Sequence, residues 1–132
     1  MSQKFADFLL EALANAARID GDAAAPEREA IAAAMSRATG APFAGAAVDA
    51  AIAAARFTRA DLTAYLRKHQ AQFSRDEKMT IVKELLSVIA ADGLFAQPER
   101  EALEAYIEAI GFAGGQVETI LDALVAPFRN AV

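Results

Sequence analysis

The sequence has no cysteine, and histidine occurs once, at position 69. The absence of cysteine excludes disulfides, thiolate metal sites and cysteine nucleophiles, and it fits a reducing compartment. Any Ser–His–Asp arrangement would have to use His69, and the sequence contains no nucleophile-elbow motif and no glycine-rich phosphate loop. We therefore interpret His69 as a packing or surface residue and expect no enzyme.

Long apolar runs and clustered basic residues are also missing. No run approaches the roughly 20 residues of a membrane span, and Asp7 and Glu11 stand where a signal peptide would need an apolar stretch. The net charge is −5 with a pI of about 4.8, and the tightest basic pair is Arg67 with Lys68. This balance disfavours nucleic-acid binding, and we expect a cytoplasmic protein without a membrane span.

Alanine and other apolar residues are abundant and recur at helical spacing. Apolar residues make up 55% of the 132 residues, and alanine favours helices over strands. The i, i+3, i+4, i+7 recurrence predicts an all-α bundle of seven helices in a single domain over residues 1–132. The predicted helices are 3–18, 26–39, 45–56, 59–70, 75–91, 97–110 and 116–129. The helix at 75–91 has the strongest apolar stripe and is expected to be the most buried, and Gly114 with Gly115 is expected to form a turn.

One stretch of the chain occurs twice. Residues 20–30 and 92–102 share Asp, Gly, Pro, Glu, Arg, Glu and Ala in register, 72 positions apart, and Gly40 or Gly111 closes each segment. The duplication indicates one domain built as two helix–loop–helix halves related by a pseudo-two-fold axis. The helices at 45–56 and 59–70 resemble the repeat poorly and are expected to link the halves.

The duplicated Asp-Gly loops are the main candidate site, and two interpretations of their acids stay open. Asp20 and Asp92 follow helix C-termini, where a carboxylate is unfavourable unless something offsets the negative helix end. Each can accept hydrogen bonds from the free N–H groups of the next helix, and then it only caps that helix. Alternatively, Asp20, Glu27, Asp92 and Glu99 provide four carboxylates for a divalent cation, Ca²⁺ or similar, if the loops meet in space. The spacing is not that of an EF-hand loop.

Two further sets of residues have a simple interpretation. The repeated pairs Arg28-Glu29 and Arg100-Glu101 are most simply first-turn charges in solvent, although repeated arginines can also clamp the partner half. Tyr65 and Tyr106 fall at helical spacing and are interpreted as core residues rather than a ligand cage.

The second copy, residues 89–99, resembles the TerB family of tellurite-resistance proteins and the related N-terminal domain of the DjlA co-chaperones. The first copy, residues 18–27, matches less well. The resemblance covers nearly the whole chain and implies a compact all-helical fold with pseudo-two-fold halves. It also implies an acidic pocket at the Asp-Gly loops, proposed to bind metal or mediate contacts, in which Asp20, Glu27, Asp92 and Glu99 would take part.

The sequence departs from the family pattern in both loops. The family often has Ser or Thr where Ala24 and Ala96 stand, so the hydroxyl of a capping box is missing here, and the first loop has Ala23 opposite Phe95. These departures are expected to weaken the first site more than the second. No DnaJ-type His-Pro-Asp motif occurs, so a co-chaperone role does not follow.

The sequence thus leaves two main functions open. The first is a non-enzymatic module of stress or tellurite response that binds a divalent cation through the loop acids and an unidentified protein partner through a helical face; a homo-oligomer is compatible with it. The second is a metal-free protein-interaction adaptor whose loop acids only cap helices. A hydrolase is the weakest candidate, because no base or nucleophile accompanies the carboxylates.

Overall fold

The computed structural model describes residues 2–19, 25–91 and 95–129. Within these ranges the chain forms seven α-helices and one short 3₁₀ helix, without strands, which confirms the all-α prediction. The elements are α1 (Gln3–Ile19), α2 (Ala25–Thr39), α3 (Gly45–Ala54), α4 (Arg59–His69), η1 (Gln70–Gln72), α5 (Arg75–Ile89), α6 (Gln97–Ala109) and α7 (Gly114–Arg129). Among the described residues, no helix has the length and apolar character needed to cross a bilayer.

Helices α4 and α5 each begin with a capping box. The Thr58 hydroxyl accepts from the Asp61 N–H at 3.1 Å, and the Asp61 carboxylate accepts from the Thr58 N–H at 3.0 Å. Ser74 and Glu77 make the same reciprocal pair at 3.1 and 2.8 Å. Each box satisfies N–H groups that have no partner inside the helix, so local sequence fixes where both helices start.

Helices α2 and α6 end at the two glycines that close the repeated segments. The Gly40 N–H donates to Ser36 O at 2.9 Å, a single-bond cap with a left-handed residue (φ 76°). At the end of α6, the Gly111 N–H donates to Glu108 O and the Phe112 N–H donates to Ile107 O, which is a Schellman motif. Both glycine stops predicted from the sequence are therefore confirmed.

Gly111→Ala is expected to lower the free energy of unfolding by about 1–2 kcal/mol, because φ there is 112° and a side chain is strained in that region. A Cβ atom would also lie 2.6 Å from Gln70 Oε1 and 3.0 Å from Lys78 Nζ. Gly40→Ala is the matched control, since a Cβ atom there meets nothing within 4 Å and adds strain alone. Urea unfolding of both variants checks this, and an equal or larger loss for Gly40→Ala would show that the contacts at Gly111 do not matter.

Three predicted boundaries are wrong by two residues: α7 begins at Gly114 rather than 116, α3 ends at Ala54 rather than 56, and α5 ends at Ile89 rather than 91. Hydrogen bonds explain the first two. Gly114 and Gly115 form the first turn of α7 rather than a separate turn, because the N–H groups of Gln116 and Val117 donate to Ala113 O, at 2.8 and 3.2 Å. The Gln116 side chain accepts from the Ala113 N–H at 3.2 Å, which is half of a capping box. Helix α3 ends at Ala54 instead of residue 56, because the N–H groups of Arg56 and Phe57 donate to Asn15 on α1.

Helix α1, and not α5 as predicted, is the most buried helix. Ten of its 17 residues are buried, against seven of 15 in α5. Helix α1 packs against α2, α3, α4 and α5, whereas α5 packs against α1, α2 and α6. Alanines line the buried surface of α1, and their small side chains let four neighbouring helices approach closely. The prediction compared the apolar stripes of the helices and took no account of this close approach. Those buried alanines are Ala6, Ala12, Ala14, Ala16 and Ala17.

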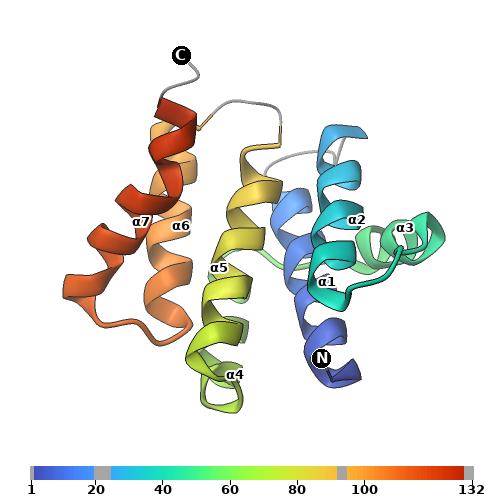
Figure 1. Ribbon diagram of the computed structural model, residues 1–132, viewed down its shortest axis with the longest axis horizontal. Coiled ribbons are helices and arrows are strands. Elements are labelled where there is room, and N and C mark those ends of the chain that lie inside the picture. The colour runs from blue at the N-terminus through green and yellow to red at the C-terminus, as the bar shows by residue number, and fades with distance from the viewer. Residues whose placement is uncertain (1, 20–24, 92–94, 130–132) are drawn as a thin grey trace.

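The two repeated helix pairs, α1–α2 and α5–α6, sit around the central contact between α1 and α5 (Figure 1). Their symmetry is partial. Helix α2 packs on α5, whereas the corresponding place beside α6 is taken by α4, which also packs on α1. Helix α3 packs on both α1 and α2, but α7 packs on α6. The linking role predicted for the middle helices thus belongs to α4.

Candidate functional site

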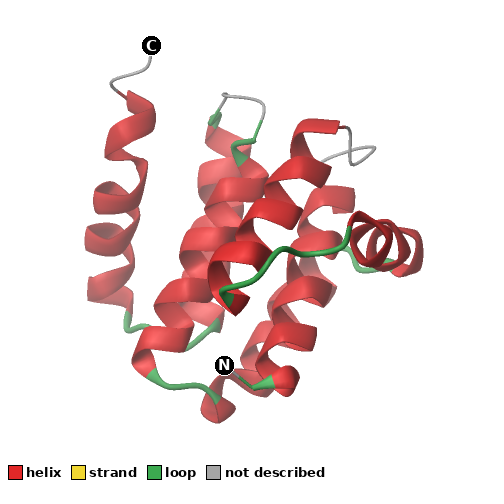
Figure 2. Cartoon of the chain, turned by 45° about the vertical axis from the view of Figure 1, so that its right-hand side comes forward, coloured by secondary structure: helices red, strands yellow, loops and turns green. Residues whose placement is uncertain are grey.

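The helix ends that flank the two Asp-Gly loops lie at one end of the bundle. Both views place the C-terminal ends of α1 and α5 and the N-terminal ends of α2 and α6 on the same side (Figures 1 and 2). Of the four predicted metal ligands, Asp20 and Asp92 lie outside the described residues. Glu27 and Glu99 lie in the first turns of α2 and α6, where the positive helix end favours an acid.

Glu27 is the described loop acid with an unusual environment. Its Oε2 atom is buried and has no hydrogen-bond partner among the described residues. A buried carboxylate oxygen without a partner is costly, so such an atom calls for a donor or a cation. Within the described ranges no three Asp, Glu or His side chains come together as a metal site.

The N-cap residue of α6 provides no side-chain cap. Ala96 stands at this position and makes no side-chain hydrogen bond, as its missing hydroxyl predicts, and a proline occupies the first turn. The first N–H groups of α6 therefore need an acceptor other than the side chain of Ala96. A carboxylate in the preceding loop is chemically suited to that role.

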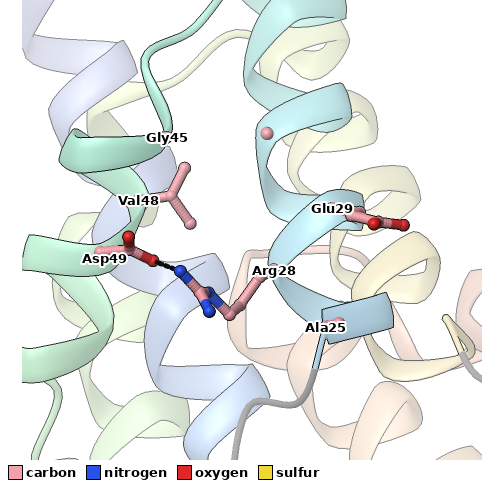
Figure 3. Close-up of a pocket in the computed structure, with 7 residues that line it drawn as sticks. Ala25, Arg28, Glu29, Gly45, Val48 and Asp49 are labelled. Atoms are coloured by element: carbon pink, nitrogen blue, oxygen red, sulfur yellow. Dashed lines mark hydrogen bonds and ion pairs between the residues drawn. The ribbon is translucent and has the colours of Figure 1, made fainter.

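The repeated arginines each bind the helix that follows them. Arg28 on α2 points toward Asp49 on α3 and forms an ion pair with it, at the edge of a pocket of about 250 Å³ (Figure 3). Glu29 points away from that pair in the same view. Both ion-pair partners are about half exposed, at 50% and 51%, so the contact adds little stability.

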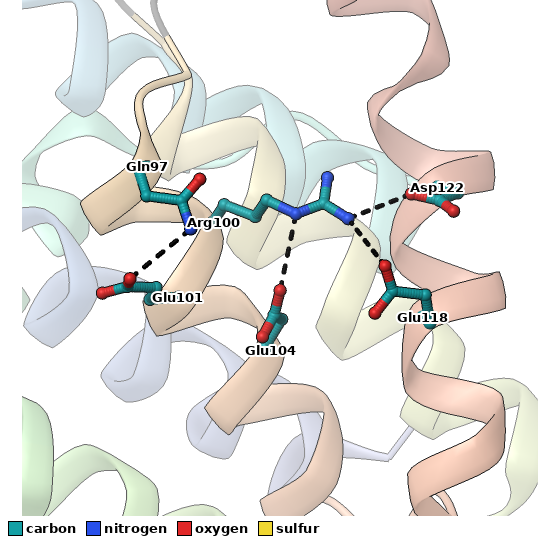
Figure 4. A network of polar contacts seen from close by, with 6 residues as sticks. All are labelled: Gln97, Arg100, Glu101, Glu104, Glu118 and Asp122. Carbon is teal, nitrogen blue, oxygen red and sulfur yellow. Dashed lines mark hydrogen bonds and ion pairs between the residues drawn. The ribbon is translucent and has the colours of Figure 1, made fainter.

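Arg100 on α6 makes the more extensive contact. Its guanidinium reaches Asp122 at 3.0 Å and Glu118 at 3.4 Å, both on α7, and Glu104 at 3.4 Å on its own helix (Figure 4). The hydrogen bond with Asp122 and the surrounding carboxylates raise the pKa of Arg100. Its side chain is only 21% exposed, so it is not a solvated charge. The repeated arginines do clamp, but they hold the next helix rather than the other half.

A comparison of the sequence with models of known protein families identifies the family of this chain. The sequence model of the family described as "Tellurite resistance protein TerB" matches residues 7–121, from α1 into α7 and through both copies of the repeat. The chain belongs to the TerB family. Searches of curated proteins and of solved structures give no match. The family resemblance read from the sequence is confirmed, and the helices are those of a TerB domain of the tellurite-resistance type.

The TerB domain also contains an ion pair with a buried carboxylate that the sequence analysis missed. Glu84 on α5 is 7% exposed, and Arg37 on α2 binds it through two bonds, Nη2 to Oε1 at 2.6 Å and Nε to Oε2 at 3.1 Å. The hydrogen bond with Glu84 raises the pKa of Arg37. The sequence does contain one indication of this pair, because Glu84 falls between Ile81 and Val88 on a buried side of α5. A charge within an apolar stripe indicates a partner on another helix.

Asn15 is the second buried polar residue of this TerB domain that the sequence analysis missed. It is 3% exposed on α1, and its Oδ1 accepts from the Arg56 N–H at 3.0 Å and the Phe57 N–H at 2.9 Å. Its Nδ2 donates to Glu11 O at 2.9 Å. These bonds hold the N–H groups of Arg56 and Phe57 against α1, and Ala55, just before them, is extended (φ −65°, ψ 132°), so α3 stops at Ala54.

His69 packs in an aromatic cluster between α1 and α4, as predicted. Its ring lies edge-on to Phe8 and Tyr65, at 5.4 and 4.9 Å between centroids, and Tyr65 stacks on Phe8 at 4.7 Å. The Tyr65 hydroxyl donates to Glu11 at 2.7 Å. Burial, followed by this hydrogen bond, raises the pKa of Tyr65. Tyr106 is buried at 1% exposure, so both tyrosines are packing residues of this TerB domain.

Proposed function

We propose that this domain is a non-enzymatic TerB module of the tellurite- and stress-response type, acting in the cytoplasm. In this proposal it binds a divalent cation through Asp20, Glu27, Asp92 and Glu99, and it binds a protein partner through a helical face. Family membership supports the module type. The observation that carries the cation proposal is the buried Oε2 atom of Glu27, which has no hydrogen-bond partner within the part of the chain that the structure describes.

The loop residues have the chemistry that a hard cation needs. Ca²⁺ takes six to eight oxygen ligands from carboxylates, carbonyls and water. The four acids supply carboxylates from both halves, and the helix ends that flank their loops lie at one end of the bundle (Figure 2). A bound cation would neutralise the repulsion among these acids and give the buried Glu27 oxygen a partner.

The alternative is a metal-free interaction adaptor whose loop acids only cap helices. The missing side-chain cap at Ala96 favours this alternative, because Asp92 could accept from the first N–H groups of α6 instead. Both proposals use the same carboxylate, but they differ in how stability responds to added metal.

A saturating divalent cation is expected to raise the melting temperature by about 5–10 °C, because ligand at 100 times its Kd adds about 2.7 kcal/mol to the stability of a domain of this size. Asp92→Asn and Glu27→Gln should each remove most of that shift. Thermal unfolding and calorimetry with Ca²⁺, Mg²⁺, Mn²⁺ and Zn²⁺ measure it. Glu108→Gln, an exposed acid on the same helix as Glu99, is the matched control and should keep the full shift.

The adaptor alternative predicts a different result for the same variants. No cation should change the melting temperature, and Asp92→Ala should cost about 0.5–2 kcal/mol with or without metal, as a lost helix cap does. Asp92→Asn should cost less, because the asparagine amide oxygen can still accept from backbone N–H groups. A metal-dependent shift that survives in both Asp92→Asn and Glu27→Gln would exclude these acids as ligands.

A further inference from the structure

A second polar site lies between α2 and α5, away from the Asp-Gly loops. It is a pocket of about 460 Å³ lined by Arg37, Ala38, Thr80, Lys83, Glu84 and Ser87. Arg37 lies in the last turn of α2 and Glu27 in the first, and ten residues of helix separate them by about 15 Å along the axis. The pocket is therefore distinct from the loop acids of the proposed function.

The buried carboxylate of Glu84 fixes the position of the Arg37 guanidinium. Both carboxylate oxygens bind Arg37, and Oε1 also lies 3.3 Å from the Ser87 hydroxyl, so the buried charge is fully compensated. Arg37 uses its Nε and one Nη atom for this, and its side chain remains 55% exposed. The other edge of the guanidinium, at Nη1, makes no hydrogen bond with the described residues. A fixed guanidinium with a free edge is suited to binding an oxyanion.

Lys83 supplies a second cation to the same pocket. Its side chain is exposed and forms no ion pair with the described residues. With Arg37 and Lys83 positive and Glu84 negative, the lining carries a net charge of +1, although the chain as a whole carries −5. An anion is therefore favoured here over a cation, and the local field opposes that of the rest of the molecule.

The hydroxyl groups of Thr80 and Ser87 in the pocket wall limit which ligands can bind there. The Thr80 hydroxyl donates to Asp76 O at 3.1 Å and the Ser87 hydroxyl donates to Glu84 O at 2.7 Å. Each hydroxyl has used its proton and can offer a ligand only a lone pair. A ligand that carries both anionic oxygens and an O–H proton matches this set of groups.

We propose that the α2–α5 pocket binds a phosphate-type oxyanion, either free hydrogen phosphate or the phosphate of a small organic monoester. Arg37 and Lys83 contact the anionic oxygens, Glu84 positions Arg37, and the Thr80 or Ser87 hydroxyl accepts the remaining proton or an ester hydroxyl. The pocket volume leaves space beside the phosphate for a small organic group.

Titration with inorganic phosphate at constant ionic strength, followed by calorimetry and by ³¹P NMR, tests the proposal. Lys83→Gln should weaken saturable phosphate binding at least about tenfold, because a charge-assisted hydrogen bond is lost. Lys83 is exposed, so this variant keeps the fold. Lys68→Gln, which removes an exposed lysine from α4, is the matched control and should leave binding unchanged.

A parallel titration with glycerol 3-phosphate distinguishes the two sources of the anion. Tighter binding than inorganic phosphate identifies an organic monoester as the better occupant, and weaker binding identifies the free anion. The proposal is overturned if phosphate shows no saturable binding at millimolar concentration, if Lys83→Gln binds as tightly as the natural sequence, or if Lys68→Gln weakens binding equally. None of these outcomes depends on whether the loop acids bind a cation.

Discussion

Arg37→Ala is expected to lower the free energy of unfolding by about 2–3 kcal/mol, because it leaves the Glu84 carboxylate buried without its cation. Removing one partner of a fully buried pair typically costs about 3–5 kcal/mol. Arg37 is 55% exposed, and water can partly replace it, so we expect a smaller loss here. Urea unfolding, with the slope compared between variants, measures the change.

The double variant Arg37→Ala with Glu84→Gln separates two causes of the stability loss, the unpaired buried charge of Glu84 and the lost packing of the Arg37 side chain. Glutamine keeps the shape of Glu84 without its charge, so the double variant should be more stable than Arg37→Ala alone by more than half of the original loss. If Arg37→Ala changes stability by less than about 0.5 kcal/mol, the pair is no more than an ordinary surface contact.

Asn15→Ala is expected to cost about 2–3 kcal/mol, because two backbone N–H groups, those of Arg56 and Phe57, lose their acceptor at once. The same substitution also opens a small cavity under α3. Hydrogen exchange at the amides of Arg56 and Phe57 gives a local readout. Both amides should be protected in the natural sequence and exchange faster in the variant.

Asn15→Leu is the control for the cavity, since leucine has the same number and branching of side-chain heavy atoms as asparagine but no polar atoms. It should destabilise the protein and speed exchange at both amides, as alanine does. A stable Asn15→Leu variant with protected amides would assign the effect of Asn15→Ala to packing and would contradict the role given to the hydrogen bonds.

The repeat illustrates how far equivalent residues predict equivalent contacts. Arg28 and Arg100 occupy the same place in the two copies, and both bind the next helix. Their partners, Asp49 and Asp122, come from segments outside the repeated stretch, and sequence comparison could not pair them. The two contacts also differ in burial, since the Arg28 side chain is 50% exposed and the Arg100 side chain is 21% exposed.

The candidate site was only partly predictable for a related reason. The first-turn positions of Glu27 and Glu99 follow from the proline and acid pattern, and these positions are confirmed. The sequence ranked the first loop as the weaker site, yet the buried unpartnered oxygen belongs to Glu27. Burial of one carboxylate oxygen depends on what packs over α2, and no pattern within the loop encodes that.

The sequence by itself determined the seven helices, their capping boxes and glycine ends, and the TerB family. These features depend on contacts between residues within about one helical turn of each other, so a short stretch of sequence is enough to predict them. Only the tertiary structure decided that α1 is the central helix, that α4 breaks the symmetry of the halves, and that Asn15 and Glu84 are buried. Each of these depends on groups many positions apart, whose distance is set by the packing of all the helices together.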